Sequence, residues 1–201
     1  MIRVYIAGPE VFLPNGFEQV ERKRALCRAY GMEPSARQGD FLHYQGGDKF
    51  VFGTMIARHN EELMLESDII IANLTPFRGI SADPGTVYEV GFMCALGRKA
   101  FGYSNTTRPY AERASADHYN GQVERALSGR LVAVDGQMVE DHGMTDNLMI
   151  DGGIARSGGF ILRGDAAPGE LFTDLMAYEA CLKKITEHIG YSHAYRDTPH
   201  L

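Results

Sequence analysis

Short apolar runs rich in β-branched residues recur along the chain and end at turn-forming residues. The most regular of them is DIIIANL (68–74), and two others are RVYIAG (3–8) and KAFGYS (99–104). Runs of this length, bounded by glycine, proline or asparagine, are typical of strands that are buried on both faces. The pattern therefore predicts three buried strands.

Helical spacing of apolar residues fills the gaps between these strands. Residues recur every three or four positions in 17–30, in the second half of 48–66, in 84–97 and in 169–189. Strand, helix, strand, helix, strand in this order predicts a parallel sheet with helices on both faces, which is an α/β fold. The tail 191–201 is expected to be loose or to pack on a neighbouring chain.

Two polar, turn-rich stretches interrupt the pattern. Residues 32–47 contain proline and several glycines and are expected to be irregular. Residues 105–145 are interpreted as an insertion, able to act as a lid, within a single domain spanning 1–201. Inside this insertion, Asp135-Gly136 stands between two short apolar runs, which predicts a β-hairpin with a type I′ turn.

Charge narrows the possible partners. The chain has 201 residues, 44% of them hydrophobic, and a formal net charge of -6, which argues against binding to a nucleic acid. The densest basic cluster, Arg22-Lys23-Arg24, lies beside Glu18 and Glu21 in a helical pattern and is expected to face solvent.

Several other classes lack support in the sequence. The odd number of cysteines, three in all and far apart, is typical of buried apolar positions in a reducing compartment. No run is long enough to span a membrane, the chain begins with a strand rather than a signal peptide, and a cytoplasmic location is expected. Neither a metal-binding spacing nor a glycine-rich phosphate loop is found, so no metal and no cofactor are expected.

Two carboxylates mark a possible site. In parallel sheets, ligands bind in the loops at the carboxyl ends of the strands, and Gly8, Asp83 and Ser104 fall on that edge. Asp83 precedes Pro84, so its ordinary explanation is a helix N-cap. Glu89 follows one and a half turns later among small and apolar residues, where a carboxylate is costly unless it is paired or used. From the residues alone, the site fits a small uncharged ligand.

Three ordered blocks of sequence carry a more specific signal. They are VYIAGPEVF near the start, SDIIIANLTPFRGISADPGTVYEVGFMCALGRK in the middle and DNLMIDGG (146–153) later. Together they resemble the nucleoside 2-deoxyribosyltransferase family, in which D-x-G-T-x-x-E-x-G follows an apolar strand. The resemblance spans roughly 1–104 and 146–189. It implies a flavodoxin-like fold and transfer of 2-deoxyribose between nucleobases.

The resemblance also implies roles for individual residues. By position, Glu89 matches the family nucleophile, Asp83 an acid that binds the sugar hydroxyls, and Tyr5 a tyrosine that orients the nucleophile. Asn147, with Met149 beside it, matches an asparagine donated to the sugar site of a neighbouring subunit. Two further residues complete the expected substrate site. Phe12 matches an aromatic residue that stacks on the base, and Gly8 lies at the end of the first strand.

One position departs from the family pattern. Some members carry, eight residues before the acid that leads into the second long strand, an aspartate that handles the proton of the leaving base. Here that residue is Asn60, and an amide cannot protonate a base. Either another group protonates the base, with Asp40 and solvent as the candidates, or the base preference differs from that of those members. Glu10 and the loop 36–40 are further candidates for contacts with the base.

The expected chemistry is a ping-pong displacement. A carboxylate beneath the anomeric carbon stabilises the oxocarbenium-like transition state and forms a covalent deoxyribosyl-glutamate, which a second base then attacks. The alternatives are an N-glycoside hydrolase of nucleosides or nucleoside 5′-monophosphates, and a nucleoside-binding module without catalysis. The expected partners are deoxynucleosides, nucleobases and further copies of this chain in a homo-oligomer.

Overall fold

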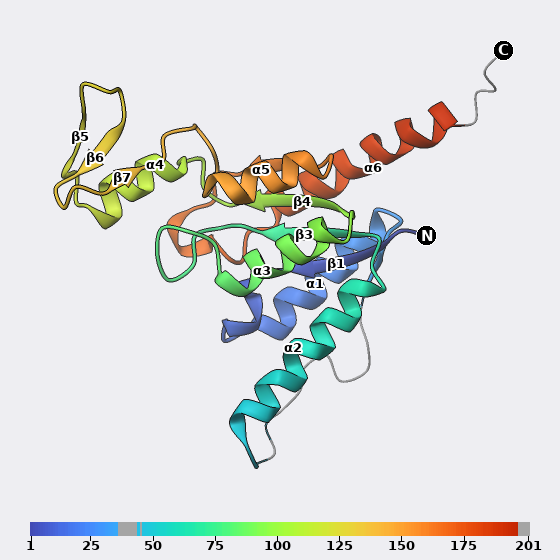
Figure 1. Cartoon of the computed structure of the whole chain (residues 1–201). Coiled ribbons are helices and arrows are strands. Elements are labelled where there is room, and N and C mark those ends of the chain that lie inside the picture. The colour runs from blue at the N-terminus through green and yellow to red at the C-terminus, as the bar shows by residue number, and fades with distance from the viewer. Residues whose placement is uncertain (36–43, 45, 197–201) are drawn as a thin grey trace.

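The backbone is a five-stranded parallel sheet between two layers of helices (Figure 1). The computed structural model describes residues 1–35, 44 and 46–196 of the chain. The strands run in the order β2-β1-β3-β4-β8, and every neighbouring pair is parallel. Their bounds are Arg3–Ala7 (β1), Glu33–Pro34 (β2), Ile69–Asn73 (β3), Lys99–Ser104 (β4) and Ile161–Arg163 (β8).

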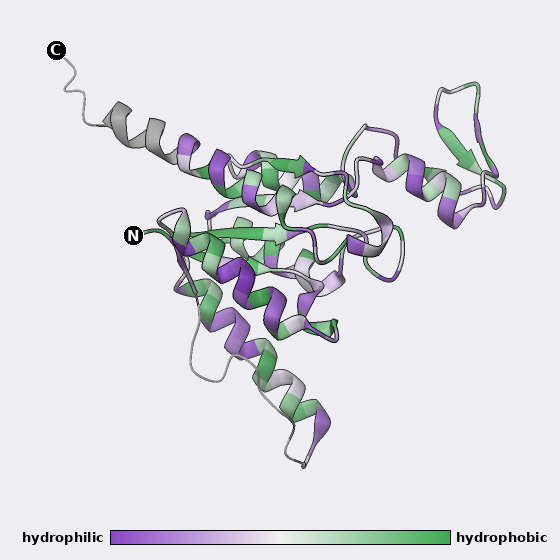
Figure 2. Ribbon diagram, turned by 180° about the vertical axis from the view of Figure 1, so that it is seen from behind, coloured by the Kyte–Doolittle hydropathy of each residue, from purple (hydrophilic) through white to green (hydrophobic). Residues whose placement is uncertain are grey.

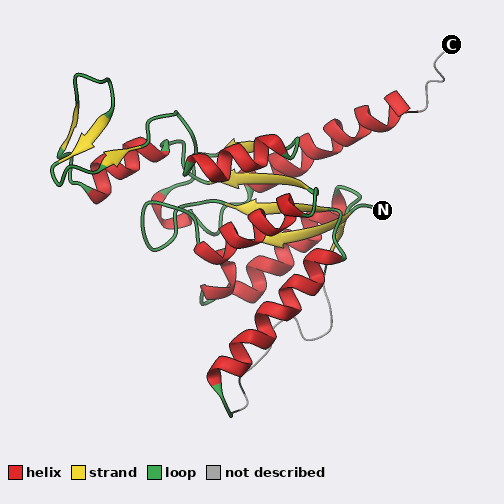
Figure 3. Cartoon of the chain, viewed as in Figure 1, coloured by secondary structure: helices red, strands yellow, loops and turns green. Residues whose placement is uncertain are grey.

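Helices cover both faces of this sheet, as Figure 3 shows. One face carries α1 (Gly16–Ala29) and α6 (Met176–Arg196). The other face carries α2 (Lys49–Leu65), α3 (Pro84–Ala95) and α5 (Leu148–Arg156). The predicted α/β fold with a parallel sheet is therefore confirmed.

Successive side chains of the central strand β3 point to opposite faces of the sheet, so the hydrophobic core has two parts. Ile69 and Ile71 of β3 pack against α1 and α6, whereas Ile70 and Ala72 pack against α2 and α3. All four side chains are buried, and burial of an isoleucine side chain contributes about 1.5–3 kcal/mol. Figure 2 shows the matching band of hydrophobic residues along the central strands.

The segment between β4 and α5 projects from the body of the molecule (Figure 1). It contains α4 (Tyr110–Arg113), a π-helical turn (Ala114–His118) and a three-stranded antiparallel sheet of β5 (Val123–Arg125), β6 (Leu131–Ala133) and β7 (Met138–Val139). The predicted hairpin is confirmed between β6 and β7. Its turn is not type I′, because Gly136 has a positive φ (82°) and Asp135 does not.

Several predicted boundaries were wrong. The whole of 49–65 is helical, not only its second half, and 33–34 forms the edge strand β2. The last helix begins at Met176 rather than at 169, after a 3-10 turn at Pro168–Glu170, and its backbone continues to Arg196. A two-residue strand is too short to show a period in the sequence, and helix ends depend on contacts made elsewhere.

The predicted face of α1 was also partly wrong. Phe17 is exposed, and the buried positions are Gly16, Gln19, Lys23 and Cys27. Lys23 does not face solvent as expected, since it is completely buried and its Nζ lies 2.7 Å from Glu10 Oε1. None of the described helices is both long and apolar enough to cross a membrane.

Candidate active site

A cavity of about 550 Å³ opens at the carboxyl end of β1. Its walls come from the end of β1, the 3-10 turn η1 (Pro9–Phe12), α1, α2 and the first half of α3. Six of the residues expected at a substrate site line it: Tyr5, Gly8, Phe12, Asn60, Asp83 and Glu89. The sheet edge predicted to hold the ligand is therefore the edge that carries the cavity.

Glu89 is the ionisable group at the centre of this arrangement. Its side chain is partly buried, and its Oε1 accepts a hydrogen bond of 2.6 Å from the Tyr5 hydroxyl. Burial raises the pKa of Glu89 from 4.5 to about 7; the Tyr5 hydrogen bond lowers it, and the charges of Asp83 and Glu10 raise it further. Tyr5 thus acts in the expected direction, but the desolvation of the carboxylate is the larger effect.

Asp83 has a structural role together with its place in the cavity. It is the N-cap of α3, and its Oδ2 accepts hydrogen bonds from the backbone N–H and the hydroxyl of Thr86, at 3.0 and 3.2 Å. The ordinary capping explanation is therefore confirmed. The cap also fixes the carboxylate at the mouth of the helix that carries Glu89, so one element positions both acids.

Gly8 and Phe12 form the wall that follows β1. A Cβ on Gly8 would lie 2.1 Å from Glu10 Oε2 and 2.9 Å from Asn73 Cβ, so this position has no room for a side chain. The Phe12 ring stacks on Phe77 with a centroid separation of 5.6 Å, and it is 53% exposed. The Arg78 guanidinium lies 4.9 Å from the centroid of the same ring, so the exposed part of Phe12, rather than a whole free face, is what the cavity offers to a planar ligand.

One face of α2 forms the opposite wall. Ile56, His59, Asn60 and Leu63 line the cavity from this helix, with the spacing i, i+3, i+4, i+7 of a single helical face. Arg24 of α1 also lines the cavity. Neither His59 nor Arg24 was expected at the site, although the helical spacing of 56, 59, 60 and 63 was a usable signal for His59.

Asn147 and Met149 are not among the residues that line this cavity. Asn147 is the N-cap of α5; its Oδ1 accepts from the N–H of Met149 at 3.0 Å, and its Nδ2 donates to Glu140 Oε1 at 2.9 Å. The Met149 side chain is 74% exposed. Neither residue lines the cavity of its own chain, and the expected donation to a neighbouring subunit stays a prediction.

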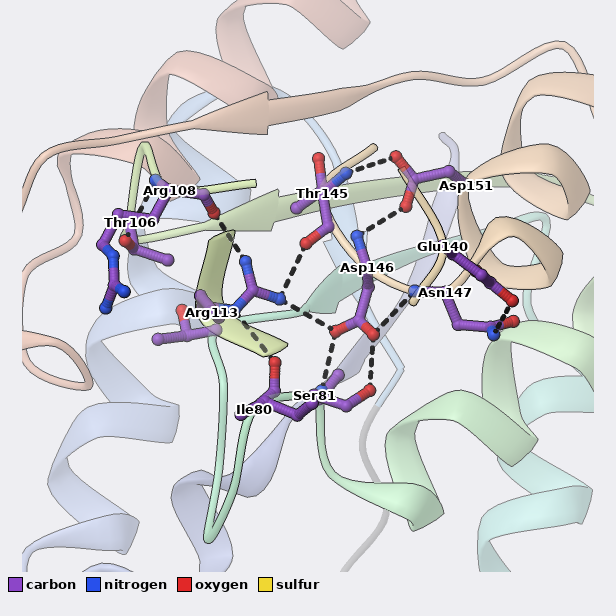
Figure 4. Close-up of polar contacts among 12 residues, drawn as sticks. Ile80, Ser81, Thr106, Arg108, Arg113, Glu140, Thr145, Asp146, Asn147 and Asp151 are labelled. Atoms are coloured by element: carbon purple, nitrogen blue, oxygen red, sulfur yellow. Dashed lines mark hydrogen bonds and ion pairs between the residues drawn. The ribbon is translucent and has the colours of Figure 1, made fainter. Parts of the chain in front are cut away.

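A buried polar cluster connects this region to the start of α3 (Figure 4). The Arg113 guanidinium donates to the backbone carbonyls of Ile80, Arg108 and Thr145 and lies 3.6 Å from Asp146 Oδ2. Asp146 in turn accepts from the N–H of Ala82 at 2.8 Å. The loop that precedes Asp83 and the segment that precedes Asn147 are therefore held together by one buried cation and one buried anion.

Other expected contacts are absent from the cavity wall. Glu10 is buried in the interior, where Lys23 Nζ and Asn73 Nδ2 donate to its Oε1 at 2.7 and 2.8 Å, so the expected contact with a base is wrong. Asp40 and the rest of 36–40 lie outside the described residues.

None of the described residues of 105–145 lines the cavity, so this segment does not form a lid over it within one chain. Over the part of the chain that is described, no group of three or more His, Cys, Asp and Glu side chains is arranged to hold a metal ion.

Comparison with known proteins agrees with this geometry. A profile of the family described as Nucleoside 2-deoxyribosyltransferase matches residues 4–149. An uncharacterized protein of Schizosaccharomyces pombe is 32% identical over 170 residues, which is 79% of this chain and 79% of that protein. The structure of a 2-desoxiribosyltransferase from Leishmania mexicana superposes with a TM-score of 0.60 at 27% identity, covering 94% of this chain and 99% of that one.

Proposed function

The chain belongs to the nucleoside 2-deoxyribosyltransferase family, and we propose that its cavity transfers 2-deoxyribose from one nucleobase to another through a covalent intermediate on Glu89. The observation that carries this proposal is the 2.6 Å hydrogen bond from Tyr5 to Glu89 inside a cavity that Asp83 also lines. An oriented carboxylate and a second acid that line one cavity support this proposal.

The first half of the reaction releases a base. Glu89 Oε attacks C1′ of the deoxynucleoside as the N-glycosidic bond breaks, and the negative charge of the carboxylate stabilises the positive charge that develops on the sugar. The Tyr5 hydroxyl holds the carboxylate in place throughout. In the second half, an incoming base attacks C1′ from the opposite face, restores the configuration and frees Glu89.

Asp83 positions the sugar in this scheme. Its Oδ2 is occupied by the Thr86 cap, so the carboxylate cannot rotate freely, and Oδ1 is available to accept from a sugar hydroxyl. A fixed acceptor lowers the entropic cost of holding C1′ in line with Glu89. Phe12, which lines the cavity and is 53% exposed, offers the open part of its ring to the base.

A second copy of the chain completes the proposed site. Asn147 and the exposed Met149 stand at the beginning of α5, outside the cavity of their own chain. They reach a sugar only in the cavity of a neighbour, which requires at least a dimer. The buried pair of Arg113 and Asp146 holds the segment before Asn147 in a fixed position on its own chain, from which it would extend toward the neighbour.

Incubation with thymidine and adenine tests the function. Appearance of 2′-deoxyadenosine is the expected result, and Glu89→Ala is expected to abolish it. Thymine release that does not depend on adenine would identify a hydrolase instead. Binding of thymidine without release of thymine would identify a nucleoside-binding module. Repetition with thymidine 5′-monophosphate distinguishes a nucleoside from a nucleotide as the substrate.

A further inference from the structure

We propose that His59 is the catalytic residue that protonates the leaving base and takes the proton back from the incoming one. This inference rests on the proposed function. It names the group that takes over the proton transfer, which the amide of Asn60 cannot perform. It follows from which side chains stand around the cavity and from what each of them can do with a proton.

Five ionisable side chains are found among the described residues that line the cavity: Tyr5, Arg24, His59, Asp83 and Glu89. The Tyr5 hydroxyl donates a hydrogen bond to Glu89, and Glu89 must be ionised to attack the sugar. Asp83 caps α3 beside Glu89, where it can contact the sugar. An arginine does not give up its proton in proteins. His59 is left as the described lining group whose type both gives and accepts a proton near neutral pH.

The place of His59 suits contact with a base. It lies on the α2 wall, on the same helical face as Ile56 and Asn60, whereas both acids belong to α3. With C1′ held over Glu89 and the sugar hydroxyls on Asp83, the base extends toward the remaining walls of the cavity. Ile56 then offers an apolar contact, and Asn60 can donate or accept at the base edge while His59 handles the proton.

Charged groups of both signs line the cavity together with His59. Asp83 and Glu89 line the same cavity as His59, and Glu62 follows His59 by three positions on α2. The positive charge of Arg24, which also lines the cavity, is offset by its ion pair of 2.8 Å with Glu21. Arg58 forms an ion pair of 3.0 Å with Glu62 and is 82% exposed, so it points to solvent rather than into the cavity.

The proposed step balances in both directions. When the C1′–N bond breaks, its electron pair passes to the base, the imidazolium of His59 transfers a proton to a ring nitrogen or carbonyl oxygen of that base, and Glu89 bonds to C1′. A neutral base leaves, and His59 becomes a neutral imidazole. When the second base attacks, its ring N–H gives its proton to His59, and the Glu89–C1′ bond breaks with the pair returning to the carboxylate. No external proton is consumed.

The dependence of rate on the leaving base tests this role. We expect His59→Gln to lower kcat/KM for thymidine by about 10²–10⁴-fold, the usual contribution of a general acid. 2′-Deoxyuridines with fluoro or trifluoromethyl groups at C5 release more acidic bases, which need less protonation, and the loss should shrink along this series. If the wild type accepts only purines, 2′-deoxyguanosine and its 7-methyl derivative replace the series. The 7-methylated base is already cationic in the nucleoside, so it leaves as a neutral molecule without taking a proton.

Two further variants make the result decisive. His188→Gln makes the same substitution on α6, on the other face of the sheet, and should leave the rates unchanged. Asn60→Asp in the His59→Gln background places a carboxylic acid one residue away on the same wall and should restore activity on thymidine at low pH. An equal loss on every leaving base, without recovery in the double variant, would overturn the role of His59. A wild type that neither exchanges nor hydrolyses nucleosides would overturn the proposed function itself.

Discussion

The Tyr5 hydroxyl lies 2.6 Å from Glu89 Oε1, across 84 positions of sequence. The first strand and the helix after the third strand meet at this hydrogen bond, on the edge of the sheet where the cavity opens. A donor so placed stabilises the ionised form of a carboxyl that burial would otherwise keep neutral. The ionisation of Glu89 at neutral pH therefore depends on Tyr5.

Removal of this hydroxyl should change the pH dependence of the reaction. The hydrogen bond lowers the pKa of Glu89, so in Tyr5→Phe that pKa rises above its value of about 7. Since only the carboxylate attacks, kcat/KM of the variant should be about 10-fold or more below that of the wild type at pH 6, and the ratio of the two should return toward one at pH 9, as expected for a charged hydrogen bond of about 1.5–3 kcal/mol. Steady-state rates from pH 5 to 9 measure the shift.

Tyr88→Phe is the matched control for this prediction. Tyr88 donates to Glu61 at the same distance, 2.6 Å, but on the exposed surface between α2 and α3. Its removal should leave the pH profile where it is. An unchanged profile in Tyr5→Phe would show that the hydroxyl does not govern the ionisation of Glu89.

Glu89 should also lower the stability of the fold at high pH. Its pKa is raised from 4.5 to about 7 in the folded chain, so the folded state binds more protons than the unfolded state between these values. The stabilisation is present below pH 4.5 and is lost as the pH rises through 7. Each pKa unit corresponds to about 1.4 kcal/mol, so Glu89→Gln should stabilise the chain at pH 8 by on the order of 2 kcal/mol. Urea unfolding at pH 5 and 8 measures this, and the partly exposed Glu61→Gln should show no such difference.

The buried ion pair of Glu10 and Lys23 should respond strongly to loss of one partner. Lys23→Met leaves the Glu10 carboxylate without its cation in the interior, where it is 3% exposed, and should cost about 3 kcal/mol or more. Chemical denaturation measures the loss. Arg28 lies on the same helix as Lys23 and forms an exposed ion pair with Glu33 of β2. Arg28→Met should therefore cost less than about 1 kcal/mol.

The double variant Glu10→Gln with Lys23→Met provides the second part of this test. It removes both charges and leaves an amide that can still pair with Asn73. Stability should recover most of the loss seen in Lys23→Met. If the two substitutions are simply additive, the pair is not coupled as its geometry indicates.

Arg113 should tolerate no other cation. Its planar guanidinium donates to three backbone carbonyls in different directions, a set that a lysine ammonium cannot reach at once. Arg113→Lys should therefore cost about 2 kcal/mol, as several buried acceptors lose their donors. Arg108→Lys, at a site with exposed partners Glu112 and Asp117, should change stability by less than about 1 kcal/mol. Similar losses in the two variants would contradict this assignment.

Much of the fold could be predicted because long buried elements require a regular spacing of apolar residues, which is visible in the sequence. The run at 68–74 has every residue of its strand buried, and the helix after Asp83 begins where its cap and Pro84 indicate. Strand β2, with two residues, carries no such pattern and exists because β1 pairs with it. The burial of Lys23 was hidden because its partner Glu10 lies on another element, and a sequence does not show that the two meet.

Site residues could be predicted where they belong to a sequence motif. They could not be predicted where only the packing of a helix places them at the cavity. Asp83, Glu89 and Tyr5 were expected and line one cavity. His59 and Arg24 line the same cavity, but each belongs to a helix whose orientation could not be known without its packing. The predicted lid over 105–145 was wrong for the single chain because that segment packs onto the loop before Asp83 instead.

The most direct test of the mechanism is to find the sugar on the protein. Incubation with thymidine in the absence of an acceptor base, rapid denaturation and peptide mapping by mass spectrometry should locate one deoxyribosyl group on Glu89, within Pro84–Ala95. The adduct should disappear when adenine is added before the quench. A deoxyribosyl group on any other side chain, or thymine release by Glu89→Ala at the rate of the wild type, would contradict the mechanism.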